Sequence, residues 1–213
     1  MNFDEFLKLT SKVKNIPLPA ESSHFKMVPP FRRALMEKQK EAIKKAKRAG
    51  VLALFYPGTN KETKLVLILR KTYKGVHSAQ VAFPGGKLEK EDASLEVAAV
   101  RETFEEVGVP IDSIEIIREL SQVYIPPSNF YVQPFFGITK RTPSFIKQDD
   151  EVEAIIEIEL QHFLDDNILI TKKVLTSYSV EVEVPAFKLN GHVVWGATAM
   201  MLSEMKDLLK PYM

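Results

Sequence analysis

Three glutamates lie close together near the middle of the chain, in the run Arg101-Glu102-Thr103-Phe104-Glu105-Glu106. If this run is helical, Glu102, Glu105 and Glu106 lie at spacings i, i+3 and i+4, so their carboxylates converge on one face. Carboxylates packed together repel one another, and a divalent cation with oxygen ligands offsets that repulsion well. Mg²⁺ and Mn²⁺ prefer such ligands and also bind phosphate oxygens, which indicates metal-assisted phosphate chemistry. A solvated acidic helix face is the alternative interpretation.

The helix that carries these glutamates is predicted over residues 93–107, with Asp92 at its N-cap and Gly108 at its end. At about 100° per residue, one arc of this helix is apolar and is expected to face the core, with the glutamates on the opposite side. That arc holds Val97, Val100, Phe104 and Val107. Just upstream, Pro84-Gly85-Gly86 allows the backbone to turn closely before the helix.

Strands and further helices must position this segment. Helices are predicted over residues 2–13, 31–48 and 197–209, the second of them strongly basic and ended by Gly50. Strands are predicted over residues 51–56, 65–69, 80–83, 120–124, 132–139, 153–159, 173–178, 180–184 and 193–195. This order favours an α/β (α+β) fold in which helices pack on a mixed sheet. We expect an N-terminal helical extension over residues 1–48 and the main domain over residues 49–213.

Composition narrows the classes of function that fit the chain. Its 213 residues suit one sizeable domain with appendages, and the absence of cysteine excludes disulfides and a zinc-thiolate site. A net charge of +1 provides no global field that would attract nucleic acid or an anionic membrane. No apolar run approaches the ~18 residues of a membrane span, and the first residues do not resemble a secretory signal. We therefore expect a cytoplasmic protein with neither nucleic acid nor a membrane as a partner.

The run from Arg101 to Val109 resembles the second half of the box that defines the Nudix hydrolase family, Arg-Glu-hydrophobic-x-Glu-Glu-x-Gly-hydrophobic, with Thr103 in the first hydrophobic slot. Gly86 lies one residue further from Arg101 than the usual spacing, and Asp92 best fills the acidic slot between them. The resemblance implies a Nudix-type α/β/α sandwich over residues 49–213. It also implies a hydrolase that cleaves a diphosphate bond.

The resemblance assigns roles to individual residues. Glu102, Glu105 and Glu106 would bind the catalytic Mg²⁺ or Mn²⁺, with Glu105 also counted among the catalytic residues. Arg101 would orient one of the glutamates, and Gly86 would let its loop approach the metal. The physical logic agrees, because diphosphate cleavage needs charge neutralised on the phosphate oxygens and a water activated for in-line attack, and metal ions do both.

The segment upstream of the box looks like the additional motif of the coenzyme A diphosphatase branch of the family. The matching residues are Arg70, His77, Gln80 and Phe83-Pro84-Gly85-Gly86, and the departures are Lys71, Gly75 and Ala79. The segment from His192 to Ala199 also looks like that branch. The resemblance implies substrate contacts for Arg70, His77, Gln80, Gly85 and Gly86. Arg70 would clamp anionic phosphate oxygens, for which the planar guanidinium is suited.

The implied substrate is coenzyme A or an acyl derivative, cut to 3′,5′-ADP and a 4′-phosphopantetheine product. Another nucleoside diphosphate linked to a second group, such as ADP-ribose or a dinucleotide, is the alternative within the family. A Nudix-fold module that binds a nucleotide without hydrolysing it is the alternative from another class. Such modules usually lack one or more box glutamates, and this chain has all three.

A general base is still needed for the attacking water. The acidic cluster Asp149-Asp150-Glu151 precedes an apolar run, and Glu151 aligns best with an acidic residue that often precedes a valine in the family. Glu151 is the candidate for the base or for an extra metal ligand, and an exposed acidic turn is the simpler interpretation. The N-terminal helices could cover the substrate cleft or a partner subunit, which leaves a homodimer open.

Overall fold

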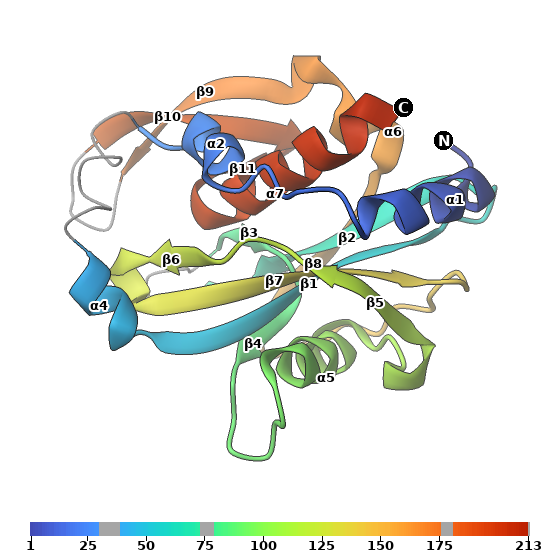
Figure 1. Ribbon diagram of the computed structural model, residues 1–213, viewed down its shortest axis with the longest axis horizontal. Coiled ribbons are helices and arrows are strands. Elements are labelled where there is room, and N and C mark those ends of the chain that lie inside the picture. Colours follow the sequence, from blue (N-terminus) through green and yellow to red (C-terminus); the bar gives the residue numbers. More distant parts are fainter. Residues whose placement is uncertain (30–38, 73–78, 176–180, 213) are drawn as a thin grey trace.

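The computed structural model describes residues 1–29, 39–72, 79–175 and 181–212 (Figure 1). The sequence-predicted substrate residue His77 lies outside these ranges, as does Gly75. The helices are α1 (Phe3–Val13), α2 (Glu21–His24), α4 (Lys40–Lys44), α5 (Leu95–Val107), α6 (Leu160–Leu164) and α7 (Gly196–Leu209). No helix among the described residues is both long enough and apolar enough to cross a membrane.

The strands form one large mixed sheet and one small antiparallel sheet. The strands of the large sheet are β1 (Lys47–Pro57), β2 (Thr63–Arg70), β3 (Val81–Ala82), β4 (Gly85–Lys87), β5 (Ile114–Glu119), β6 (Val123–Ile125), β7 (Phe130–Thr139) and β8 (Val152–Glu159). Its path is β3-β2-β1-β7-β5, while β4 pairs with β1, β6 with β7 and β8 with β2. Among the described strands of this sheet, only β1 and β7 pair in parallel. The small sheet, in the order β11-β10-β9, holds β9 (Leu169–Leu175), β10 (Glu181–Leu189) and β11 (His192–Val194).

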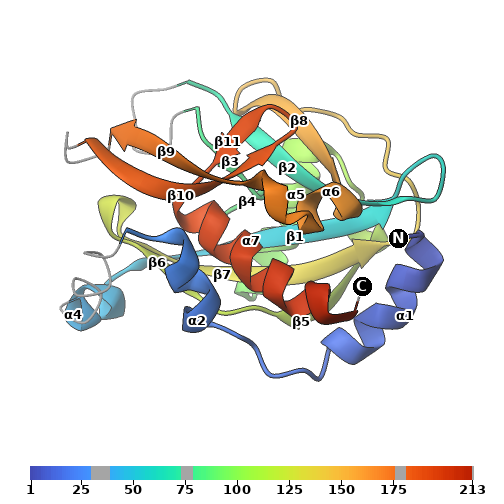
Figure 2. The ribbon, with the colours of Figure 1, turned by 90° about the horizontal axis from the view of Figure 1, so that it is seen from above.

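Helices cover both faces of the large sheet, which confirms the predicted fold class. Helix α5 packs on one face, while α1 and α7 pack on the other (Figures 1 and 2). Residues alternate between these faces along β1, as a buried strand requires. Leu54 joins the core on the α5 side, and Phe55 joins the core under α1, where its ring centroid lies 5.0 Å from that of Phe6. The N-terminal helix thus contributes directly to the main core.

Most predicted elements exist, with shifted ends, but the basic helix predicted over residues 31–48 is wrong in its described part. Only Lys40–Lys44 is helical there, and β1 already begins at Lys47. Gly50 lies inside β1, where it pairs with Gln133 of β7 and with Gly86 of β4. Strand pairing therefore overrides the helical propensity of the basic residues. Of the strand predicted over residues 120–124, only 123–124 is extended, as part of β6, while 120–122 lie between β5 and β6.

The predicted core arc of the glutamate helix is wrong in part, because Val107 is buried but two other residues of the arc are exposed. Val97 and Phe104 are 43% and 47% exposed, whereas Ala98, Ala99 and Thr103 are buried with Val107. The reason is the closeness of the helix to the sheet, since a Cβ on Gly50 would lie 2.1 Å from the Leu95 carbonyl oxygen and 3.1 Å from the Ala99 Cβ. Only small side chains fit at this contact between α5 and β1, and Val97 and Phe104 face outward.

We expect Gly50→Ala to destabilise the protein by about 2–3 kcal/mol, because the added methyl group overpacks a backbone contact that cannot yield without moving α5. Since α5 carries the glutamates, activity is expected to fall as well. Thermal unfolding and kcat measure the two effects. Gly58→Ala is the matched control, because the three atoms nearest to its added Cβ all belong to the Glu62 carboxylate, the end of a flexible side chain, and not to the backbone. Equal stability of the two variants would contradict the packing argument.

Candidate metal and active site

Four segments meet at the outer edge of β4: the glutamate face of α5, the end of β2, the glycine pair of β4 and the residue before β8. Glu106 is their common point. The Gly85 N–H donates to Glu106 Oε2 at 2.9 Å, and Arg70 Nη1 lies 3.3 Å from Glu106 Oε1. Arg70 Nη2 also lies 3.9 Å from Glu151 Oε2. The structure thus brings together four residues that the sequence placed in one site, across 81 positions of chain from Arg70 to Glu151.

Glu106 is buried, contrary to the prediction that all three glutamates face away from the core. It is 2% exposed. Burial raises the pKa of the Glu106 carboxyl to about 7, against the lowering effects of the Gly85 N–H and of Arg70, and the charges of Glu102 and Glu151 raise it further. A desolvated carboxylate with two acidic neighbours is a group whose ionised form a bound cation would stabilise.

Glu102 faces Gly86 of β4. A Cβ on Gly86 would lie 2.2 Å from Glu102 Oε1, so the absence of a side chain at Gly86 makes room for this carboxylate. Burial raises the pKa of the Glu102 carboxyl; Arg101 opposes the rise, and the charges of Glu105 and Glu151 add to it. Gly86 was expected to let its loop approach the metal. In the structure it makes room for the carboxylate of Glu102, a predicted metal ligand.

Arg101 organises the exposed side of the cluster. Its Nε and Nη2 donate to Asp92 Oδ1 and Oδ2, both at 3.0 Å, and its Nη1 donates to Glu105 Oε2 at 3.0 Å. Arg101 Nη2 also lies 3.2 Å from Glu102 Oε1. The hydrogen bonds from Arg101 lower the pKa of Asp92, so the bidentate pair is fully charged at neutral pH. Arg101 therefore contacts two of the three predicted metal ligands, as its orienting role requires.

Asp92 does not cap the helix, so its predicted N-cap role is wrong. Ser94 is the N-cap of α5, and its side chain accepts from the Val97 N–H at 3.2 Å. Asp92 takes the acidic slot of the motif instead. Although the spacing before Arg101 is longer than usual, both carboxylate oxygens of Asp92 still accept from Arg101.

The residues present fit a hard divalent cation. Within the described ranges, no three His, Asp or Glu side chains form a ready metal cage in this side-chain arrangement, since Glu105 turns toward Arg101 and Glu106 toward Arg70. However, the charges of Glu102 and Glu151 raise the pKa of the Glu106 carboxyl, and the charges of Glu105 and Glu151 raise the pKa of the Glu102 carboxyl. An all-oxygen set of mutually repelling carboxylates, two of them desolvated, suits Mg²⁺ or Mn²⁺.

The other substrate-motif residues that the structure describes lie beside this cluster. The Arg70 N–H donates to the Gln80 carbonyl at 3.0 Å, which places Gln80 at the end of β2. Ala79, in the motif's glycine slot, has a φ of 54°, a left-handed conformation that explains why glycine suits this position. The C-terminal motif segment also reaches this end of the sheet, where Thr198 Oγ1 donates to the Val81 carbonyl at 3.0 Å.

The sequence did not single out Gln148, although the structure places it between two site residues. Its N–H donates to the Glu106 carbonyl at 3.1 Å, and its Oε1 accepts from the Glu151 N–H at 2.8 Å. The available signal was its position three residues before Glu151, where an amide side chain can reach the following backbone N–H groups.

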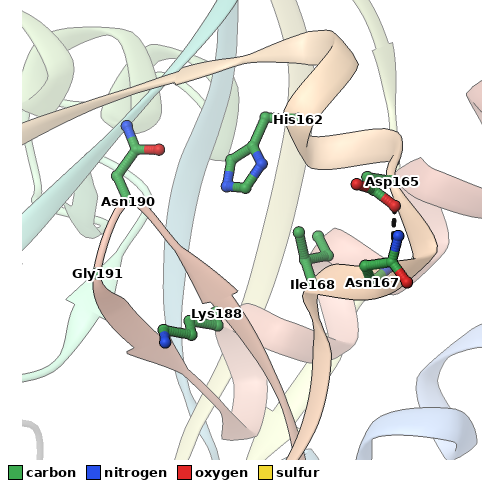
Figure 3. Close-up of a pocket in the computed structure, with 7 residues that line it drawn as sticks. All are labelled: His162, Asp165, Asn167, Ile168, Lys188, Asn190 and Gly191. Carbon is green, nitrogen blue, oxygen red and sulfur yellow. Dashed lines mark hydrogen bonds between the residues drawn. The ribbon is translucent and has the colours of Figure 1, made fainter.

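A separate hollow of about 420 Å³ lies at the far end of β8 from Glu151 (Figure 3). It lies between α6 with the turn that follows it and the β10–β11 turn, and is lined by His162, Asp165, Asn167, Ile168, Lys188, Asn190 and Gly191. Of the predicted site residues that the structure describes, none lines it.

The family model and the relatives that match this chain all belong to one family. Residues 46–175 match the model of the NUDIX domain. The chain is 30% identical over 155 residues to the peroxisomal coenzyme A diphosphatase ndx-8 of Caenorhabditis elegans, covering 72% of this chain and 64% of that protein. It is 32% identical over 124 residues to the mitochondrial Nudix hydrolase 15 of Arabidopsis thaliana, covering 57% and 43%. The matched region thus spans less than two thirds of the length of either relative.

Solved structures share the fold at low sequence identity. A MutT/nudix family protein from Enterococcus faecalis superposes with a TM-score of 0.51 at 16% identity, covering 92% of this chain and 76% of that one. The Nudix hydrolase RenU from M. Smegmatis gives a TM-score of 0.50 at 12% identity, covering 79% and 88%. These likenesses concern the fold alone.

Proposed function

Because the chain belongs to the Nudix hydrolase family, we propose that it cleaves the diphosphate bond of coenzyme A or an acyl-coenzyme A, with Mg²⁺ or Mn²⁺ bound by Glu102, Glu105 and Glu106. The products would be 3′,5′-ADP and a 4′-phosphopantetheine. The observation that carries the proposal is the grouping of Glu102, Glu106 and Glu151 around Gly85, Gly86 and Arg70.

Each residue of this group has a part in the proposed reaction. Arg70, which lies between Glu106 and Glu151, binds phosphate oxygens of the substrate. Glu151 accepts the proton of the attacking water, and Arg101 holds Glu102 and Glu105 in place. A bound divalent cation supplies charge neutralisation on the diphosphate and makes the water a better nucleophile.

Support for coenzyme A as the substrate comes from the upstream motif and from the name of the Caenorhabditis elegans relative. Arg70, Gln80, Gly85 and Gly86 of that motif lie at the cluster. The motif's departures at Lys71, Gly75 and Ala79 are the reason to test other substrates beside it.

A panel of coenzyme A, acetyl-coenzyme A, ADP-ribose and a diadenosine polyphosphate, each with Mg²⁺ or Mn²⁺, tests the substrate. We expect products with the masses of 3′,5′-ADP and 4′-phosphopantetheine from coenzyme A. Its kcat/KM should exceed that for ADP-ribose. Faster turnover of ADP-ribose would refute the proposed substrate and leave the Nudix chemistry in place.

A further inference from the structure

The loop between β7 and β8 completes the end of the glutamate helix. The last carbonyls of a helix have no partner inside it. Here the Ile146 N–H donates to the Val107 carbonyl at 3.0 Å, and the Gln148 N–H donates to the Glu106 carbonyl at 3.1 Å. Gly108 permits this approach, because its φ is +76° and a Cβ there would lie 2.8 Å from the Ile146 Cβ. The loop is therefore fixed to the backbone of a predicted metal ligand.

The side chain of Gln148 then fixes the part of the loop that leads to Glu151. Its Oε1 accepts from the Asp150 N–H at 2.7 Å and from the Glu151 N–H at 2.8 Å. Its own carbonyl accepts from the Val152 N–H at 3.0 Å, at the start of β8. An amide oxygen has two lone pairs, so both are used by these two neighbouring peptides. The direction in which Glu151 leaves the backbone is set by these bonds.

These contacts close a ring of four residues. Gln148 joins the backbones of Glu106 and Glu151, while Arg70 joins their carboxylates at 3.3 Å and 3.9 Å. We propose that Gln148 is a positioning residue that sets the Glu151 carboxylate against Glu106. The inference rests on the proposed function, in which Glu151 accepts a proton from water.

Removing the amide oxygen should therefore lower turnover without weakening substrate binding. A misplacement of about 1 Å in a reacting group can cost about 100-fold in rate. We expect Gln148→Leu, which keeps the bulk and loses both acceptor contacts, to lower kcat about 10- to 100-fold with KM nearly unchanged. Gln148→Glu keeps a side-chain oxygen for the two N–H groups and should recover most of the loss.

Amide hydrogen exchange in the metal-free protein provides a readout independent of turnover. Gln148→Leu should speed exchange at Asp150 and Glu151, and Gln148→Glu should restore their protection. Asp149→Asn is the matched control, because Asp149 is an 83% exposed side chain in the same loop that contacts Lys147. It should change neither exchange at these amides nor kcat.

The outcomes separate this inference from the proposed function. A wild-type protein inactive on the whole panel would reject the proposed function. If the wild type is active, a normal kcat in Gln148→Leu rejects the positioning role alone, as does a full kcat in Glu151→Gln, because nothing would then need positioning. If Gln148→Leu lowers kcat, raises KM and lowers the melting temperature together, and Gln148→Glu does not restore them, the role of Gln148 is purely structural.

Discussion

Replacing Glu105 with glutamine is expected to lower kcat about 1,000-fold or more while the fold stays intact. Glu105 is the most exposed of the three box glutamates, with 49% of its side chain accessible, and Arg101 Nη1 at 3.0 Å is its ion-pair partner. Exposed ion pairs of this kind stabilise a protein by only about 0.3–0.5 kcal/mol. The change therefore removes a negative ligand from the proposed metal site and leaves the core untouched.

The measurement compares kcat on the best substrate of the panel with thermal unfolding and with Mn²⁺ binding by titration. Weaker Mn²⁺ binding should accompany the loss of turnover. Glu96→Gln is the matched control, since Glu96 is an exposed glutamate in the first turn of the same helix. It should behave as the wild type does. Survival of activity in Glu105→Gln would show that the metal site is wrongly assigned.

The local chemistry of the site could be predicted from the sequence because it follows from spacing along one helix. Glu102 and Glu106 both reach β4, and Arg101 reaches Glu105 one turn away. A resemblance to a known motif added Gly86 and Asp92, whose contacts with α5 no periodicity could have predicted. Both residues touch the predicted partners through space, at Glu102 and Arg101.

The orientation of that helix could not be predicted from hydrophobicity. A wheel assigns Val97 and Phe104 to the core because they are the most apolar residues, yet both face outward. What decides the orientation is the approach of Gly50 to the Leu95 carbonyl, a contact between segments 45 residues apart. Gln148 could not be predicted for the same reason. Its hydrogen bond to the Glu106 carbonyl exists only because the end of α5 lies beside its loop.

Replacing Glu204 with glutamine is expected to destabilise the protein by about 3 kcal/mol, which corresponds to a melting temperature lower by about 6–12 °C. Glu204 lies on α7 and is fully buried. Its carboxylate accepts from the Ala20 N–H at 3.2 Å, from the Ser121 N–H at 3.1 Å and from the Ser121 hydroxyl at 2.5 Å. His24 Nε2 lies 3.3 Å from its Oε2. An amide NH₂ in place of one oxygen would face donors instead of accepting from them.

The effect should concentrate on the N-terminal segment, because Ala20 and His24 belong to it while Ser121 lies between β5 and β6. Proteolysis of the folded variant should therefore begin near residues 20–24 before the domain unfolds. Glu181→Gln is the control, since Glu181 is 67% exposed and lies 3.9 Å from Lys173. A Glu204→Gln variant as stable as this control would contradict the assigned network.

The pH dependence of the same comparison isolates the charge of Glu204. Burial alone would raise the pKa of this carboxyl, but hydrogen bonds from His24 and Ser121 outweigh it, and the pKa lies below its ordinary value. A carboxyl whose pKa is lowered by folding contributes stability that is fully present above its unfolded pKa and is lost as pH falls through its folded pKa. Glutamine cannot titrate, so the stability difference between the wild type and Glu204→Gln should be constant near neutrality and shrink in acid. A difference that did not shrink in acid would contradict a lowered pKa of Glu204.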